Sequence, residues 1–287
     1  MKLALGTVQF GLKYGVANQT GQVSRSEAKA ILQLALANEI DTIDTAIAYG
    51  ESESCLGEVG TENFKLITKL PPLPHESINV AAWVNHQVNE SLSRMRVSAL
   101  YGLLLHRSDQ LLGPNGADLF RSLQALKDKK KVQKVGVSIY SPDELSALKS
   151  YSLDIVQAPF NLLDQRLLSS GWMQRLKDDG VEIHTRSTFL QGLLLMEPAN
   201  IPTKFAPWSR LWLIWHQWLA NRDFDAVEAC LAFPISFREI DRIIVGVDNV
   251  SQFKQILQAT DRKFITEFPD LRCEDENLIN PAKWSKL

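Results

Sequence analysis

Cysteine is scarce in this chain of 287 residues, and its three cysteines lie far apart at positions 55, 230 and 273. No C-x-x-C pair is present, so the sequence lacks the disulfide framework of small secreted domains and the spacing of a cysteine-based zinc site. His75, His86 and His216 show no metal-ligand spacing either. We therefore expect a reducing compartment and no metal site.

Excess charge and long apolar runs are also missing. The formal net charge is −2, which argues against a general nucleic-acid or membrane-surface binder. The densest apolar stretch, 208–220, is interrupted by Arg210 and His216 and is not expected to span a bilayer. Too few apolar residues follow Lys2 for the core of a signal peptide. These features predict a soluble cytoplasmic protein with no nucleic-acid or membrane partner, and they leave open whether it is a monomer or a homodimer.

The common nucleotide motifs are absent as well. No G-K-[ST] P-loop occurs, and no G-x-G-x-x-G follows the first apolar run. Instead, short apolar runs alternate with amphipathic helical stretches. Strands are expected at 3–7, 41–45, 65–70, 99–106, 134–138, 154–158, 181–187 and 242–247. Helices are expected at 24–38, 52–59, 78–96, 117–129, 142–150, 169–178, 208–233 and 251–258.

This alternation predicts an α/β fold. Strands that alternate with helices pair in parallel through right-handed crossovers, and eight such units suit a closed (β/α)8 TIM barrel. We expect a single domain over residues 1–287, with a short C-terminal segment, about 262–287, near the barrel mouth. An open doubly wound sheet is the alternative. Ser24 and Glu27 are spaced as a capping box at the start of the first long helix.

Four ionisable side chains fall at the ends of consecutive predicted strands. Asp44 ends the second strand with Tyr49 five residues later, Lys69 ends the third, and His106 ends the fourth. In a parallel barrel these ends meet at one rim, where catalytic residues lie. Alone, Lys69 could be an ordinary strand-end lysine and His106 a core histidine. Their coincidence at adjacent strand ends favours a site.

The residue types at this rim indicate proton chemistry. A phenol has a pKa of about 10, so it acts as an acid near pH 7 only beside a cation and a carboxylate. Lys69 would favour proton release from Tyr49, Asp44 would keep Lys69 charged, and His106 would position a substrate oxygen. Such a set suits proton delivery to a carbonyl oxygen while a hydride reaches its carbon.

These motifs resemble the aldo-keto reductase family. The matching segments are DTAIAYGESES at 44–54, ITK at 67–69, LLLH at 103–106, GVS at 136–138, VQAPFN at 156–161 and FLQGLLL at 189–195. The opening residues 5–18 are also similar to a bacterial branch associated with sugar or surface-polysaccharide metabolism. The resemblance implies NAD(P)(H)-dependent reduction of an aldehyde, ketone or sugar carbonyl, or the reverse reaction. Tyr49 would be the general acid, Asp44 and Lys69 its tuning pair, and His106 the substrate-orienting residue.

The resemblance also implies a cofactor site along the strand ends. The matching residues are Ser138 and Gln157 at the nicotinamide carboxamide, Arg186 beside its ring, Ser187, Phe189 and Gln191 at the pyrophosphate, and Gly246, Gln252 and Gln255 around the adenosine phosphate. NADP(H) rather than NAD(H) is the cofactor expected on family grounds. However, no cation for a 2′-phosphate stands at Gly246, Val247 or Gln252, where many members carry one.

Two other functions stay open at this stage. One is a catalytically weak, cofactor-binding sensor or regulatory subunit on the same scaffold. The other is a lyase or isomerase that uses a Schiff base at Lys69. Trp208, Trp212, Trp215 and Trp218 can share one helical face, which would either pack on the barrel wall or form a dimer or substrate surface.

Overall fold

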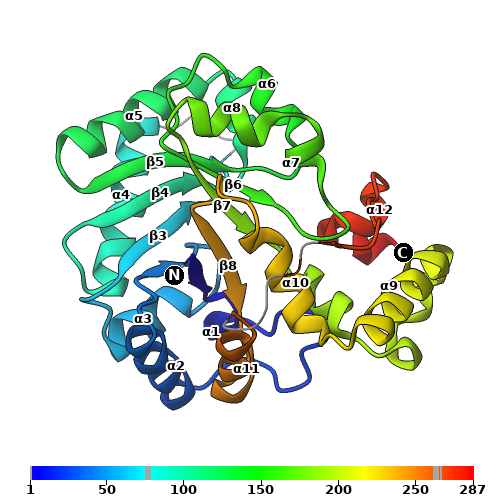
Figure 1. Cartoon of the computed structure of the whole chain (residues 1–287). Coiled ribbons are helices and arrows are strands. Elements are labelled where there is room, and N and C mark those ends of the chain that lie inside the picture. The colour runs from blue at the N-terminus through cyan, green and yellow to red at the C-terminus, as the bar shows by residue number, and fades with distance from the viewer. Residues whose placement is uncertain (1, 75–78, 261–264, 266) are drawn as a thin grey trace.

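Eight parallel strands close into a barrel in a computed structural model that describes residues 2–74, 79–260, 265 and 267–287 (Figure 1). The strands are β1 (Leu3–Gly6), β2 (Thr42–Asp44), β3 (Lys65–Leu70), β4 (Leu100–Leu105), β5 (Val132–Ser138), β6 (Ile155–Pro159), β7 (Glu182–Arg186) and β8 (Arg242–Gly246). Each strand pairs with its neighbours in chain order, and β8 pairs with β1 from Leu3↔Ile243 to Gly6↔Gly246. This closure confirms the predicted (β/α)8 barrel and excludes the open sheet.

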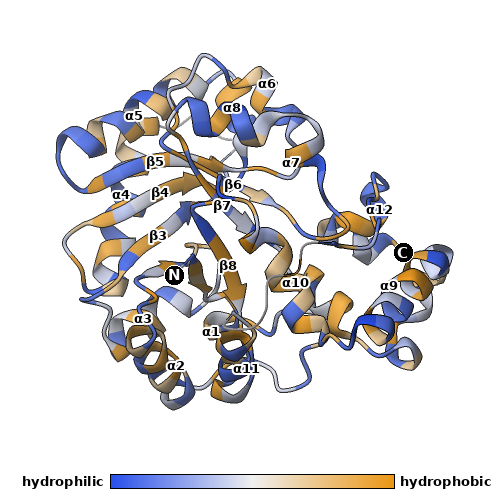
Figure 2. Cartoon of the chain, viewed as in Figure 1, coloured by the Kyte–Doolittle hydropathy of each residue, from blue (hydrophilic) through white to orange (hydrophobic). Residues whose placement is uncertain are grey.

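Helices surround the barrel (Figure 1). The α-helices are α1 (Val8–Gly11), α2 (Arg25–Ala37), α3 (Ser52–Val59), α4 (Val80–Met95), α5 (Gly116–Asp128), α6 (Asp143–Ala147), α7 (Arg166–Ser169), α8 (Trp172–Asp178), α9 (Ser209–Arg222), α10 (Ala226–Ile235), α11 (Val250–Thr260) and α12 (Glu276–Ile279). The 3-10 helices are η1 (Ser108–Leu112), η2 (Leu190–Leu195), η3 (Pro198–Asn200), η4 (Thr203–Trp208) and η5 (Pro281–Lys286). In Figure 2 the apolar colour prevails along β8, whereas the helices mix apolar and polar residues, because only one side of each helix faces the barrel.

The start of α2 differs from its prediction in one respect. Ser24 caps the helix as expected, with its hydroxyl accepting from the N–H of Glu27 at 3.2 Å. The Glu27 carboxylate, however, accepts from the N–H of Val250 at 2.6 Å instead of closing a capping box. Glu27 therefore joins α2 to the first turn of α11.

Two predicted helices have different bounds in the structure. The segment predicted as one helix over 208–233 is α9 and α10, because Asp223 adopts a left-handed backbone (φ 52°) and Asp225 caps α10. The 169–178 segment forms α8 only from Trp172, after Gly171 at φ 74°. The expected start of the 78–96 helix lies outside the described residues, which contain α4 from Val80 onward.

The tryptophans of α9 pack on the loop that follows β7. Trp212 and Trp215 are buried, and their indole N–H groups donate to the carbonyls of Phe205 and Leu194, each at 3.0 Å. These two side chains therefore pack inside the molecule, although their hydrogen-bond partners belong to the 3-10 helices after β7 and not to the barrel wall that was predicted. Among the described residues, no helix combines the length and apolar composition needed to cross a membrane.

The C-terminal residues 267–287 contact the loops after β6 and β7. The N–H of Cys273 donates to the carbonyl of Leu163 at 3.0 Å, and the indole of Trp208 donates to Asp275 at 3.1 Å. Figure 1 accordingly shows α12 and the C-terminus beside α9. That this segment shapes the barrel mouth stays a prediction.

A carboxylate at the end of the barrel where the strands begin joins three of the strands. Glu182, at the start of β7, accepts from Tyr101 of β4 at 2.6 Å, from Lys134 of β5 at 2.5 Å and from His184 at 3.1 Å. Burial favours the protonated acid, but the hydrogen bonds from His184, Lys134 and Tyr101 outweigh it and hold the pKa of Glu182 well below its usual range.

We predict that Glu182→Gln lowers the free energy of unfolding by about 1–3 kcal/mol at pH 7, because charge-assisted hydrogen bonds are lost. A carboxyl whose folded pKa is depressed contributes its stability above the unfolded value, about 4.3, and loses it as the pH falls below that. The gap between variant and wild type should thus shrink between pH 5 and pH 3.5 in urea unfolding. Glu267→Gln, at an exposed pair with Arg222, is the matched control. A gap that is constant with pH would contradict this role.

Candidate active site

Asp44 and Lys69 form a buried ion pair where β2 and β3 end. Lys69 Nζ lies 2.6 Å from Asp44 Oδ2, and the two side chains are 1% and 6% exposed. Nζ also donates to the carbonyl of Thr45 at 2.9 Å. Burial disfavours the ammonium, but the Asp44 carboxylate and the Tyr49 hydroxyl more than offset it, so the pKa of Lys69 is raised. Lys69 is therefore a charged group in a desolvated setting.

Asp44 is held by other strands as well. The side-chain amide of Gln157 in β6 donates to Asp44 Oδ1 at 2.7 Å. The backbone N–H and the hydroxyl of Thr7 both donate to the Asp44 carbonyl, each at 3.0 Å. Thr7 just after β1, Lys69 of β3 and Gln157 of β6 thus converge on one aspartate, which fixes the direction of the ion pair.

Tyr49 and His106 complete the predicted group. The ring centroid of Tyr49 lies 5.1 Å from Lys69 Nζ and 5.8 Å from the His106 ring, which it meets edge-on at 82°. Burial first, and then the charge of Lys69, lower the pKa of His106 to about 4. At neutral pH the imidazole is uncharged, so one ring nitrogen donates and the other accepts.

The loop that carries Tyr49 rests against α1, a short helix that the sequence pattern did not predict. A Cβ atom on Gly11 would lie 1.7 Å from the carbonyl oxygen of Tyr49, so only glycine permits this contact. From the other side, the Ser52 hydroxyl donates to the carbonyl of Thr7 at 2.8 Å. These contacts fix the backbone on both sides of the phenol.

A cavity of about 600 Å³ opens above these residues. Lys69 is buried behind it, with Nζ turned to Asp44 and Thr45. The remaining predicted site residues all line the cavity: Asp44, Tyr49, His106, Ser138, Gln157, Arg186, Ser187, Phe189, Gln191, Gly246, Gln252 and Gln255.

Arg186, which was predicted beside the nicotinamide ring, is held by neighbouring residues. Its guanidinium donates to the carbonyl of Ile139 at 2.9 Å and to the Ser187 hydroxyl at 3.3 Å. Its Cζ atom lies 4.9 Å from the ring centroid of Tyr140. The charge is therefore anchored on the cavity wall between β5 and β7.

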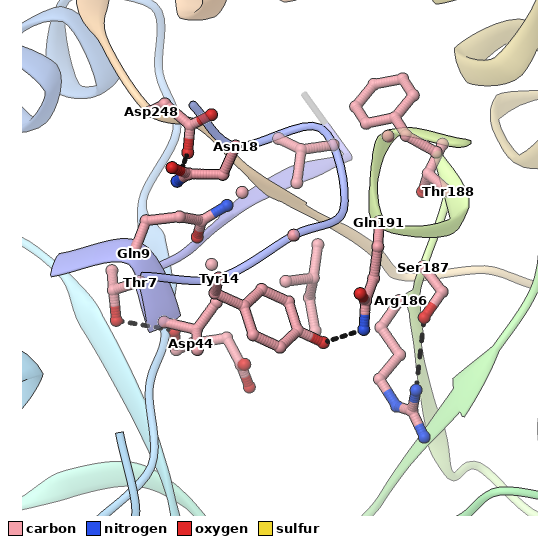
Figure 3. Close-up of a pocket in the computed structure, with 18 of the residues that line it drawn as sticks. Thr7, Gln9, Tyr14, Asn18, Asp44, Arg186, Ser187, Thr188, Gln191 and Asp248 are labelled. Carbon is pink, nitrogen blue, oxygen red and sulfur yellow. Dashed lines mark hydrogen bonds between the residues drawn. The ribbon is translucent and has the colours of Figure 1, made fainter. Parts of the chain in front are cut away.

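The loop after β1 contacts the loops after β7 and β8 across the cavity (Figure 3). The amide of Gln191, after β7, donates to the Tyr14 hydroxyl at 3.0 Å, and Asn18 donates to Asp248, after β8, at 2.8 Å. Tyr14 and Asn18 belong to the loop after β1. Ser187 and Gln191 adopt left-handed backbones (φ 64° and 55°), a strained conformation that is common at functional sites.

Sequence reasoning missed several of these residues. Gln9, Tyr14, Asn18, Tyr140, Thr188 and Asp248 all line the cavity. Asp248 could have been noticed, because it lies inside the segment assigned to the adenosine phosphate. The others lie in loops or, for Gln9, in the short helix α1, where the local sequence carries no periodic signal.

The lining suits a long polar ligand such as a nicotinamide dinucleotide. Gln9 and Thr188 each hold a buried oxygen that has no hydrogen-bond partner among the described residues. Unpaired buried polar atoms cost free energy, which a polar ligand in the cavity would relieve. Within the described parts of the chain, no three His, Cys, Asp or Glu side chains are grouped to hold a metal ion.

The comparisons with known proteins agree with this geometry. Residues 2–270 match the Aldo/keto reductase family, so this chain belongs to that family. The family reduces carbonyl groups of small molecules, which makes the protein an oxidoreductase.

Relatives with a name or a solved structure are distant. The chain is 20% identical to an uncharacterized oxidoreductase of Bacillus subtilis, YqkF, with 93% of each chain covered. It is 27% identical to D-arabinose 1-dehydrogenase of Saccharomyces cerevisiae, over 46% of this chain and 45% of that protein. The holo form of an aldo-keto reductase from Bacillus halodurans superposes with a TM-score of 0.71 at 18% identity, covering 92% of this chain and 88% of that one. At this identity the likeness supports the fold alone.

We predict that Gly11→Ala lowers kcat about 10-fold or more, because the added methyl displaces the Tyr49 carbonyl and tilts the phenol. Cofactor affinity should change less than about threefold, because the contact lies beneath the loop rather than in the cavity. Gly113→Ala is the control, since its Cβ would meet its nearest neighbour at an ordinary 3.5 Å. Steady-state kinetics and fluorescence titration measure both effects. Equal kcat in the two variants would show that α1 does not position Tyr49.

Proposed function

We propose that this protein reduces the carbonyl group of a small aldehyde, ketone or sugar, or catalyses the reverse oxidation, with a nicotinamide dinucleotide as redox partner. The observation that carries the proposal is the buried pair of Lys69 and Asp44 beside Tyr49, with a neutral His106 next to the phenol. Bound in the cavity, the nicotinamide would supply the hydride.

Tyr49 would deliver the proton to the carbonyl oxygen. The Lys69 ammonium, 5.1 Å from the Tyr49 ring centroid, stabilises the negative charge that develops on the phenol oxygen when the proton leaves. Asp44 keeps that ammonium charged and directed. A positioned acid of this kind contributes about 10²–10⁴ in rate.

His106 would orient the substrate rather than transfer the proton. Its imidazole is neutral at pH 7, because its pKa is about 4, so it can donate one hydrogen bond to a carbonyl oxygen without adding charge. In the reverse direction it would bind the hydroxyl group of an alcohol or a sugar.

The cofactor would be held along the strand ends. Ser138 and Gln157 lie side by side where β5 and β6 pair, facing the catalytic group. Gln157 already donates to Asp44, so a ligand amide would meet its carbonyl oxygen. Ser187 and Gln191 would contact the phosphates. Because one relative is named for D-arabinose oxidation, aldoses are the first substrates to test.

We predict that Tyr49→Phe lowers kcat about 10²–10⁴-fold while dinucleotide affinity stays within about threefold of wild type. Tyr101→Phe is the matched control, because it removes a hydroxyl at the far end of the barrel. Stopped-flow or steady-state absorbance at the reduced cofactor band, across aldehydes and aldoses, measures the rate.

Full activity in Tyr49→Phe would refute the acid role. Tight dinucleotide binding with no turnover on any carbonyl, in the wild-type protein, would instead support a sensor or regulatory subunit.

A further inference from the structure

The cavity has two chemically different ends. Tyr49 and His106 follow β2 and β4, whereas Gly246, Asp248 and Gln252 lie where β8 leads into α11. Figure 3 shows Asp248 and Asn18 on the far side of the cavity from Arg186. If the nicotinamide lies beside Tyr49, as proposed above, the adenosine half of the dinucleotide must extend to the β8–α11 end.

No lysine or arginine is found at the β8–α11 end among the described residues that line the cavity. Among the described residues that line the cavity, Arg186 is the one lysine or arginine, and its guanidinium is held by Ile139 and Ser187 near β5 and β7. Lys254, the lysine of α11, is exposed and does not line the cavity. A 2′-phosphate carries a charge of about −1.5 to −2 and needs such a cation.

A carboxylate stands there instead. The described partners of Asp248 are neutral amides: Asn18 donates to Oδ1 at 2.8 Å and Gln252 to Oδ2 at 3.5 Å. Neither partner cancels its charge. Asp44, the other acid that lines the cavity, is neutralised by Lys69.

Three N–H groups at and just before the start of α11 already have acceptors. Helix N-termini attract phosphate through free N–H groups. Here the N–H of Val250 donates to the Glu27 carboxylate at 2.6 Å, and that of Gln252 to Asn249 at 2.9 Å. The N–H of Asp248 donates to the Gln252 side chain at 2.8 Å. A phosphate would have to displace these acceptors, one of which is itself negatively charged.

We propose that Asp248 makes the β8–α11 end a site for an adenosine ribose with a free 2′-hydroxyl, so that the protein binds NAD(H) in preference to NADP(H). A ribose hydroxyl can donate to a carboxylate, which gives a charge-assisted hydrogen bond, whereas a 2′-phosphate would meet like charge. This reverses the NADP(H) preference expected from the family resemblance. The inference rests on the proposed function, because that function places the dinucleotide in this cavity.

Dissociation constants for NADH and NADPH, measured side by side without substrate, test the inference. Quenching of tryptophan fluorescence is a suitable readout, because Trp215 donates to Leu194, whose neighbour Leu195 lines the cavity. We expect NADH to bind about tenfold more tightly than NADPH, and Asp248→Asn to remove most of that ratio. Asp118→Asn, an exposed acid paired with Arg121 on α5, is the matched control and should leave the ratio unchanged.

A second variant adds the missing cation. Gln252→Arg should tighten NADPH about tenfold and change NADH less than about threefold. This result does not depend on how well the loop tolerates a change at Asp248.

The outcomes separate the two proposals. Equal or tighter binding of NADPH by the wild-type protein overturns the NAD(H) preference and leaves the proposed reductase intact. A ratio that Asp248→Asn and Gln252→Arg leave unchanged overturns the role of Asp248. Failure to bind either dinucleotide overturns both the inference and the proposed function.

Discussion

The buried ion pair between Asp44 and Lys69 is the interaction on which the site depends. A desolvated ammonium without a partner costs several kcal/mol, so Lys69 can remain inside the barrel only if Asp44 stays ionised and fixed. Gln157 of β6 and Thr7, just after β1, both hold that aspartate. The pair thus requires a closed barrel, because its supports come from strands on different sides of the axis. The site can therefore assemble only when the sheet has closed.

The charge of Lys69 reaches the neighbouring groups. The Lys69 ammonium lies 5.1 Å from the centroid of the Tyr49 ring, and its charge helps to keep His106 neutral. Charge is arranged in the opposite sense at the other end of the cavity, where Asp248 faces neutral amides. A ligand that fills the cavity would lie with one end near the Lys69 ammonium and the other near the Asp248 carboxylate.

Local patterns in the sequence were sufficient for the barrel and for the rim. The β3 strand at 65–70 and the α3 helix at 52–59 have their predicted bounds, and the four rim residues meet as the strand count required. Features that depend on contacts between residues far apart in the sequence could not be predicted. The α1 helix is fixed by the close contact of Gly11 with the carbonyl of Tyr49. The Glu27 carboxylate accepts from the N–H of Val250 in α11 instead of forming the predicted capping box. The break at Asp223 depends on a left-handed backbone that an apolar period does not reveal.

The pKa of His106 reports the charge of Lys69 most directly. Nuclear magnetic resonance titration of the labelled imidazole, assigned with a His106→Gln spectrum, should give a value of about 4 in the wild-type protein. In Lys69→Met the nearby cation is gone, so the pKa should rise toward 6.5, while burial keeps it from reaching that value. A wild-type pKa near 6.5, or one that Lys69→Met leaves unchanged, would contradict a charged Lys69 at the centre of the site.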